Sequence, residues 1–232
     1  MPGFVLHLVA AQMLLNKVQN RIEEKYFLWG NLLPDATMNK SISHFWKTDD
    51  YNTLIRTPQL DVFFNKYRFK LHNSSILGYF YHLYIDWKFF KEYLPQRVSF
   101  LDLKGQETTE KENVCWARIK HTGEQITIKD FYSEKYYYGD YTRMNHYLVE
   151  RYQVSLDYDV SVGEFEIDEI DCCNVCEISQ QLNNYLRKSE EGIEALKVFE
   201  IHDLLQMLEN ATDEFMERYL LDNMNFRMPR GK

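Results

Sequence analysis

The sequence lacks two features that would place the chain in a membrane or carry it across one. None of its apolar runs reaches the ~20 residues that a membrane-spanning helix needs. Residues 1–15 are largely apolar, but they show neither the basic start nor the small-residue cleavage site of a signal peptide, and His7 interrupts them. We therefore expect a soluble, cytoplasmic protein without a transmembrane segment.

The sequence also lacks an excess of positive charge. The formal net charge is −8, and Lys and Arg form no dense patch along the sequence. Because electrostatically steered binding to nucleic acid or anionic lipid usually relies on such a patch, we expect no nucleic-acid partner. A single substrate phosphate remains compatible with this composition, since a metal ion can supply positive charge locally.

The four cysteines do not form a zinc ribbon. Three of them, Cys172, Cys173 and Cys176, lie in one acidic segment, and its C-x-x-C has no second copy. A metal or redox role for Cys173 and Cys176 is the less favoured interpretation. Reduced, partly buried thiols fit a cytoplasmic protein better.

The sequence does contain the pattern of a helical protein with an aromatic core. Apolar residues make up 45% of the chain and aromatic residues 16%, which is ample material for one core. Apolar side chains recur at spacings of three and four, the period of amphipathic helices. We find no repeats and no dividing linker, and so predict a single domain over residues 1–232, with a flexible tail at 223–232. The expected helices cover residues 4–24, 58–71, 75–94, 139–152, 175–190 and 197–222.

Two prolines set expected boundaries of these helices. Pro34 disfavours helical geometry at the residue before it, so residues 30–35 should leave the helix. Pro95 should end the long helix that begins near residue 75.

Residues 97–131 differ from the rest of the chain. The segments 114–120 and 125–128 alternate and are rich in β-forming residues, and a turn around Gly123 separates them. We expect a β-hairpin insertion that flanks or caps a pocket of the helical body. The predicted fold class is mainly α, a compact helical bundle with this small β-hairpin insertion.

The sharpest chemical signal is a His-x-x-x-Asp pair in the long helix. His82 and Asp86 are one turn apart and share a helix face, so both can contact one ion. Their neighbours are apolar, and burial of an unpaired carboxylate costs several kcal/mol. A metal ion would satisfy the pair; a His–Asp hydrogen bond or a distant Arg are the alternatives.

Three further polar residues stand in apolar surroundings. His7 lies in the first helix, Asp35 follows Pro34, and His44 lies in a loop between bulky apolar residues. Singly, they would be explained as a hydrogen-bonded core histidine, a turn or capping residue, and a loop histidine. Together with His82 and Asp86 they indicate one metal site gathered from distant segments.

This ordered set resembles the zinc-dependent phospholipase C family, which is distantly related to the fungal single-strand nucleases. The resemblance covers residues 1–95, and it rests on the opening Met1-Pro2-Gly3-Phe4, on residues 30–35 and 43–45, and on the helix with His82 and Asp86. It implies a compact helical bundle that binds one to three Zn²⁺ ions. By position, one ion would be held by Asp35, His44, His82 and Asp86. His7 would bind a neighbouring ion, with Asp86 bridging the two.

The chain also departs from the family pattern. Family members hold a further ion with a His shortly after the helical Asp and with a His-x-x-x-Glu; here Glu92 follows Asp86, and the second pattern occurs only as His146 and Glu150. An exposed helical pair is the alternative for these two residues. The secreted enzymes use their freed amino terminus as a ligand, which we do not assume for Pro2.

The resemblance implies hydrolysis of a phosphodiester or phospholipid head group by metal-activated water. Asp35 would orient that water or act as a base. The alternatives are a non-catalytic interaction module with a structural metal site, or a helical protein whose His and Asp residues form a buried hydrogen-bond network.

Overall fold

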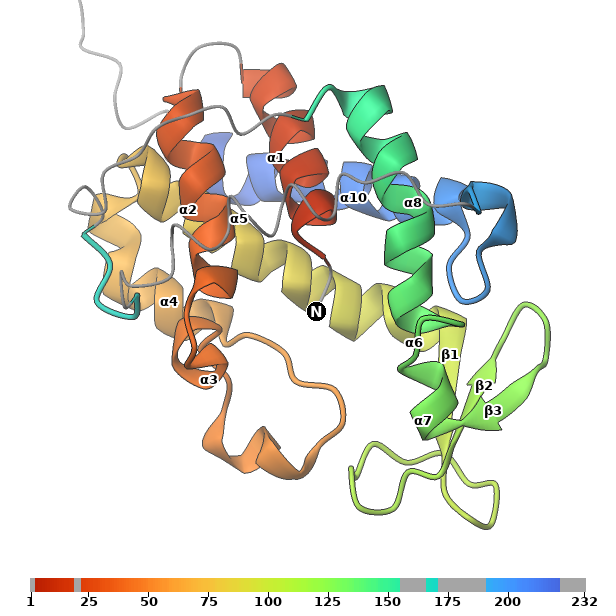
Figure 1. The fold of residues 1–232 in the computed structure, drawn as a ribbon. Coiled ribbons are helices and arrows are strands. Elements are labelled where there is room, and N and C mark those ends of the chain that lie inside the picture. Colours follow the sequence, from red (N-terminus) through yellow and green to blue (C-terminus); the bar gives the residue numbers. More distant parts are fainter. Residues whose placement is uncertain (1–2, 19–21, 155–165, 171–190, 222–232) are drawn as a thin grey trace, which may run out of the picture.

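The computed structural model describes residues 3–18, 22–154, 166–170 and 191–221 (Figure 1). Three helices form its centre: α1 (Phe4–Val18), α2 (Glu24–Ala36) and α5 (Ser74–Lys88). Shorter helices α3 (Lys40–Ser43) and α4 (Leu60–Tyr67) connect α2 to α5, together with 3₁₀ turns at Thr48–Asn52 and Arg68–Lys70. Helices α8 (Tyr137–Tyr152) and α10 (Ile201–Phe215) pack against α1. The mainly helical class is thereby confirmed.

Helices α2 and α5 cross at very short range because each contributes a glycine to the contact. A Cβ atom on Gly30 would lie 2.0 Å from the Ser75 carbonyl oxygen, and one on Gly78 would lie 2.1 Å from the Phe27 carbonyl oxygen. Only glycine permits this approach. The crossing matters for the site, because it places the C-terminal turn of α2 beside the middle of α5.

The expectation that residues 30–35 leave the helix is wrong, because Pro34 lies inside α2. Proline removes one helical hydrogen bond and crowds the carbonyl of the residue four positions earlier, here Gly30. The tight packing of Gly30 against α5 holds this segment helical in spite of that loss. As a result, Asp35 stands in the last turn of α2 instead of in a loop.

The long helix also continues past its expected end. A π-helical turn at Phe89–Tyr93 follows α5, and α6 (Leu94–Arg97) contains Pro95 in its first turn. Proline is tolerated there because the first backbone N–H groups of a helix need no helical partner. The first helix does not reach residue 24 as expected: α1 covers Phe4–Val18, and residues 22 and 23 are not helical.

Residues 98–127 contain a three-stranded antiparallel sheet in the order β1 (Val98–Leu101), β2 (Trp116–Ile119) and β3 (Gln125–Thr127). The β2–β3 pair is the expected hairpin, and its turn uses Gly123 at a φ of 73°. Strand β1 was not predicted, because all four of its residues are buried and they therefore show no alternation. Phe100, Ala117 and Ile119 join the main hydrophobic core, so the sheet is part of the packed body.

The remaining described elements are α7 (Ile128–Phe131), a 3₁₀ turn at Ile193–Ala195 and a π-helical turn at Met216–Leu221. The expected helix at 175–190, the Cys173–Cys176 pair and the tail at 223–232 lie outside the described residues. Within the described part of the chain, every helix is too short or too polar to cross a bilayer.

Candidate metal centre

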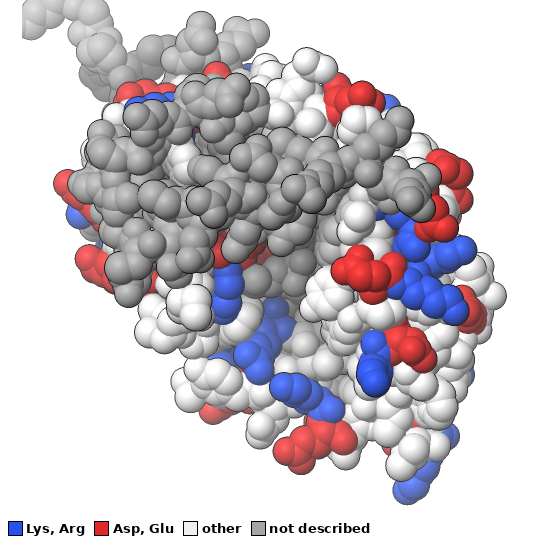
Figure 2. All heavy atoms as spheres, in the orientation of Figure 1, with Lys and Arg blue, Asp and Glu red and all other residues white. Residues whose placement is uncertain are grey.

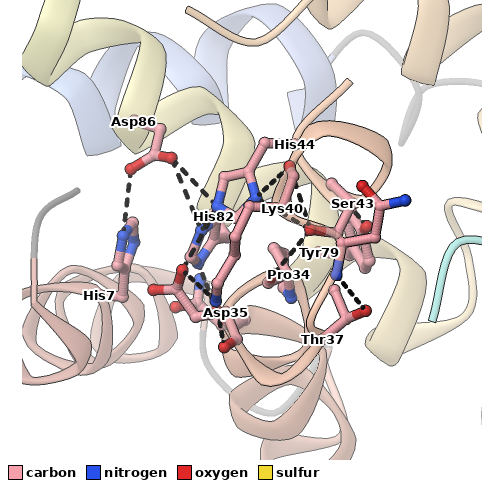
Figure 3. Close-up of polar contacts among 12 residues, drawn as sticks. His7, Pro34, Asp35, Thr37, Lys40, Ser43, His44, Tyr79, His82 and Asp86 are labelled. Atoms are coloured by element: carbon pink, nitrogen blue, oxygen red, sulfur yellow. Dashed lines mark hydrogen bonds and ion pairs between the residues drawn. The ribbon is translucent and has the colours of Figure 1, made fainter. Parts of the chain in front are cut away.

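Five polar side chains from four separate segments meet in the interior (Figure 3). His7 comes from α1, Asp35 from the last turn of α2, His44 from the residue that ends α3, and His82 and Asp86 from α5. The three imidazoles are fully buried, and the two carboxylate side chains are only 5% and 1% exposed. The structure therefore brings together the residues that the sequence pattern singles out.

Backbone carbonyls fix the orientation of two of the imidazole rings. His82 Nδ1 lies 2.7 Å from the Asn31 carbonyl oxygen, and His44 Nδ1 lies 3.1 Å from the Lys40 carbonyl oxygen. Because a carbonyl only accepts hydrogen bonds, each Nδ1 carries the proton and each Nε2 presents a lone pair. The two Nε2 atoms face one another at 3.3 Å. Two facing lone pairs repel, so the arrangement calls for a positive charge between them, either a metal ion or a proton.

The distances among four donor atoms match those around a small tetrahedral ion. His44 Nε2 lies 3.4 Å from Asp35 Oδ1 and 3.5 Å from Asp86 Oδ2, and His82 Nε2 lies 3.8 Å from Asp86 Oδ2. Tetrahedral zinc with bonds near ~2.0–2.2 Å separates its ligand atoms by about 3.3–3.6 Å. His44, His82 and Asp86 thus stand at nearly the spacing that zinc requires, and Asp35 lies at that spacing from His44.

Asp86 faces the histidines on both of its sides. Its Oδ2 is turned toward His44 and His82, while its Oδ1 lies 3.3 Å from His7 Nε2. The His7 ring stacks on the His82 ring, with centroids 3.7 Å apart and planes 13° apart. Asp86 therefore offers Oδ2 to the side of the site that holds His44 and His82, and Oδ1 to the side that holds His7.

Several of these buried atoms lack a hydrogen bond. Neither ring nitrogen of His7 and neither carboxylate oxygen of Asp86 has a well-oriented partner among the described residues. A buried polar atom without a partner costs about 1–3 kcal/mol, and native proteins rarely tolerate a group of them. The four unpaired atoms fit a site that binds a cation.

Burial and mutual charge fix the protonation states. Burial, reinforced by neighbouring His7, lowers the pKa of His82 to about 3. Burial acts to raise the pKa of Asp35 and of Asp86, but the surrounding imidazoles outweigh it and hold both pKa values below the ordinary range, that of Asp35 well below. At neutral pH the carboxylates are charged and His82 is neutral, which is the state that metal binding requires.

Two sets of donors converge closely enough to share an ion. His44, His82 and Asp86 form one set, and His7, Asp35 and His82 form the other, with all ligand atoms of a set within 4.8 Å of one another. These buried His and Asp groups can bind a metal ion.

Lys40 lies at the edge of the centre. Its ammonium group donates hydrogen bonds to the Asp35 backbone carbonyl and to Asp35 Oδ1, the latter at 3.3 Å. The Lys40 side chain is 32% exposed, so it adds a positive charge between the buried centre and solvent.

The pair His146 and Glu150 belongs to neither set of converging donors. On α8 these residues contact each other at 3.3 Å, and their side chains are 32% and 70% exposed. They form the exposed helical pair that was the alternative interpretation. Asp140, also on α8, instead accepts hydrogen bonds from the backbone N–H groups of residues 197–199.

Sequence reasoning missed the groups that orient the ligands. The Asn31 and Lys40 carbonyls hold the imidazoles, and the Ser43 hydroxyl contacts His44 Nδ1 at 3.0 Å while donating to the Pro34 carbonyl at 2.8 Å. Backbone acceptors leave no signature in a sequence. Asn31 and Ser43 lie in the segments 30–35 and 43–45, which carry part of the family resemblance. This was the only feature of the sequence that pointed to them.

No family model, curated protein or solved structure matches this chain. Its function is therefore inferred from the centre itself and from the residue pattern around it.

Proposed function

We propose that this protein is a zinc-dependent phosphodiesterase, similar in chemistry to phospholipase C, whose ion is held by Asp35, His44, His82 and Asp86. The proposal depends chiefly on one observation: the unprotonated Nε2 atoms of His44 and His82 face each other at 3.3 Å, with two carboxylates beside them. Such an arrangement is stable only around a positive charge.

The donor set favours zinc over the commoner divalent cations. Calcium and magnesium prefer sites made wholly of oxygen ligands, whereas zinc accepts imidazole nitrogen and carboxylate oxygen together. His7 would hold a second ion, with Asp86 bridging through its other oxygen. The resemblance to zinc-dependent phospholipase C allows one to three ions.

The residues around the centre support hydrolysis of a phosphodiester or phospholipid head group. When bound, zinc supplies Lewis acidity toward a phosphoryl oxygen and makes water more acidic. The ion pairs of Asp35 with Lys40 and His44 both involve Oδ1, so Oδ2 would accept a hydrogen bond from an attacking water and orient it. Lys40 would place its positive charge near the anionic substrate.

A structural metal site in a non-catalytic interaction protein is the second candidate. The near-complete burial of all five side chains favours it, because a catalytic ion needs an open position for water and substrate. A buried His/Asp network without metal would require that a proton replace the ion between His44 and His82.

Zinc content and turnover, measured on the same preparations, separate these candidates. Wild type and Asp86→Asn are each assayed with excess zinc against an aryl phosphodiester reporter, with His146→Ala as a control for loss of an exposed histidine. We expect His146→Ala to match wild type and Asp86→Asn to lose at least ~100-fold in turnover, because Asp86 touches both halves of the centre. Equal turnover in wild type and Asp86→Asn would reveal a contaminating enzyme. Zinc bound without turnover would favour the structural role.

A further inference from the structure

A pocket of about 270 Å³ opens beside the candidate metal centre. Its walls come from the loop after α3 and from the segment that leads into α8, and they include Trp46, Arg56, Tyr132, Tyr137 and Tyr138. Figure 2 shows a hollow on one face of the molecule, with Lys and Arg side chains around its edge. The pocket has room for one ring-sized group.

Trp46 connects the pocket to the centre. Its indole lines the pocket, and the same ring lies 5.3 Å from the ring of His44. Tyr137 also lines the pocket, and its side chain is almost fully buried. The pocket and the centre are therefore neighbours, separated by the contact between the Trp46 and His44 rings.

Among the described residues that line this pocket, Arg56 is the only charged one. Its guanidinium stacks on Trp46 and Tyr51, 5.1 and 5.3 Å from the ring centroids, and donates a hydrogen bond to the Tyr51 carbonyl at 3.1 Å. No carboxylate in the described part of the chain lies within ion-pair distance of Arg56. By comparison, Arg97 and Arg143 each pair with two acidic side chains. The charge of Arg56 is held in place by aromatic rings and left without an anion.

We propose that this pocket binds an apolar, ring-sized arm of the substrate that carries a second negative charge, and that Arg56 selects for that charge. The inference rests on the proposed function, because it assigns the part of a phosphodiester that lies beyond the scissile phosphate. Aromatic walls alone would also attract a cationic arm. Arg56 already occupies the Trp46 face and repels a second cation, so an anionic arm is favoured. A carboxylate or a phosphonate on the arm supplies the same chemistry.

The test uses p-nitrophenyl phosphodiesters that share one leaving group and differ only in the second arm: benzyl, 4-carboxybenzyl, 4-phosphonobenzyl or 4-(trimethylammonio)benzyl. In wild type we expect kcat/KM for the two anionic arms to exceed that for benzyl by about tenfold, the lower end of what a hydrogen bond to a charged group contributes. The trimethylammonio arm should be the poorest. Comparison of the two anionic arms shows whether carboxylate or phosphonate is preferred.

Variants assign the preference to one residue. Arg56→Gln should abolish the anionic preference mainly through KM and leave turnover of the benzyl diester near wild type. Arg56→Lys should keep part of the preference, since it keeps the charge and loses the planar stacking. Arg68→Gln is the matched control, because Arg68 also stacks on an aromatic ring, Phe69, but does not line the pocket.

Binding, measured separately, keeps the inference testable without turnover. Calorimetric titration of the zinc-loaded protein compares 4-carboxybenzyl methylphosphonate with benzyl methylphosphonate, and the same tenfold preference is expected in wild type but not in Arg56→Gln. Turnover of all arms at similar kcat/KM would overturn the pocket assignment and leave the proposed function intact. Preferential binding of the anionic analogue without turnover would overturn the phosphodiesterase and retain the pocket. A preference that survives in Arg56→Gln would refute the role of Arg56.

Discussion

Replacement of His82 by Ala should remove the thermal stabilisation that zinc gives this protein. His82 supplies one of four donor atoms, and its ring stacks on His7, so its loss disturbs both halves of the centre. Zinc at about 100 times its Kd stabilises a folded state by about 2.7 kcal/mol. For a chain of this size each kcal/mol corresponds to roughly 2–4 °C, so wild type should melt roughly 5–11 °C higher with zinc than without it.

In His82→Ala the same zinc concentration should have almost no effect. Loss even of an outer-sphere partner typically lowers metal affinity 10–100-fold, and a direct ligand should cost at least ~100-fold. The variant would then stand near its Kd, where the stabilisation is about 0.4 kcal/mol, a shift of roughly 1 °C.

Differential scanning fluorimetry, with and without zinc, provides the measurement. Each variant is compared with its own metal-free form. The effect that loss of the buried ring has on the melting temperature is then present in both measurements and cancels. His146→Ala should shift like wild type, because His146 belongs to neither set of converging donors. A shift in His82→Ala as large as that of wild type would refute the assignment, since zinc would then bind elsewhere.

Two further outcomes follow from the buried charges. Metal-free protein should lose stability as the pH falls below about 6.5. In the folded state the pKa of His82 is near 3, so between these two pH values only the unfolded state binds a proton at this residue. Asp35 and Asp86 have lowered pKa values in the folded state, so they add to the loss of stability in more acidic solution. Urea denaturation at pH 7 and 5 checks the sign, and equal stability at both would contradict it. Asp140→Ala should cost about 3 kcal/mol, because it leaves the N–H groups of residues 197–199 without an acceptor, and those of Val198 and Phe199 are buried. A loss below about 1 kcal/mol by the same assay would show that water replaces the carboxylate.

The candidate metal ligands could be recognised because polar residues stand out in apolar stretches of the sequence. His82 and Asp86 stand one turn apart among apolar neighbours, and a helix places both on one face. The proximity of His7, Asp35 and His44 could be anticipated on similar grounds, since each polar group in apolar surroundings needs a partner. Local pattern was sufficient for this part of the site.

Tertiary packing decided what the sequence could not show. Pro34 remains helical because Gly30 packs directly on α5, which is a contact between residues 45 positions apart in the chain. All four residues of strand β1 are buried, so the strand lacks the alternation of exposed and buried positions by which a strand can be recognised in a sequence. The pocket gathers Trp46, Arg56 and the tyrosines near α8 from segments without a shared motif, so nothing in their spacing predicted it.

Zinc content of the pure protein tests the central claim most directly. Wild type and His44→Ala are dialysed against dilute zinc and then against metal-free buffer. Their zinc content per chain is then measured by inductively coupled plasma mass spectrometry. His44 is the informative position because its Nε2 lies within 3.5 Å of donor atoms from Asp35, His82 and Asp86. We predict at least one zinc ion per wild-type chain and almost none in folded His44→Ala. Wild type that retains no zinc, or His44→Ala that retains as much as wild type, would contradict the assignment of these residues to a metal centre.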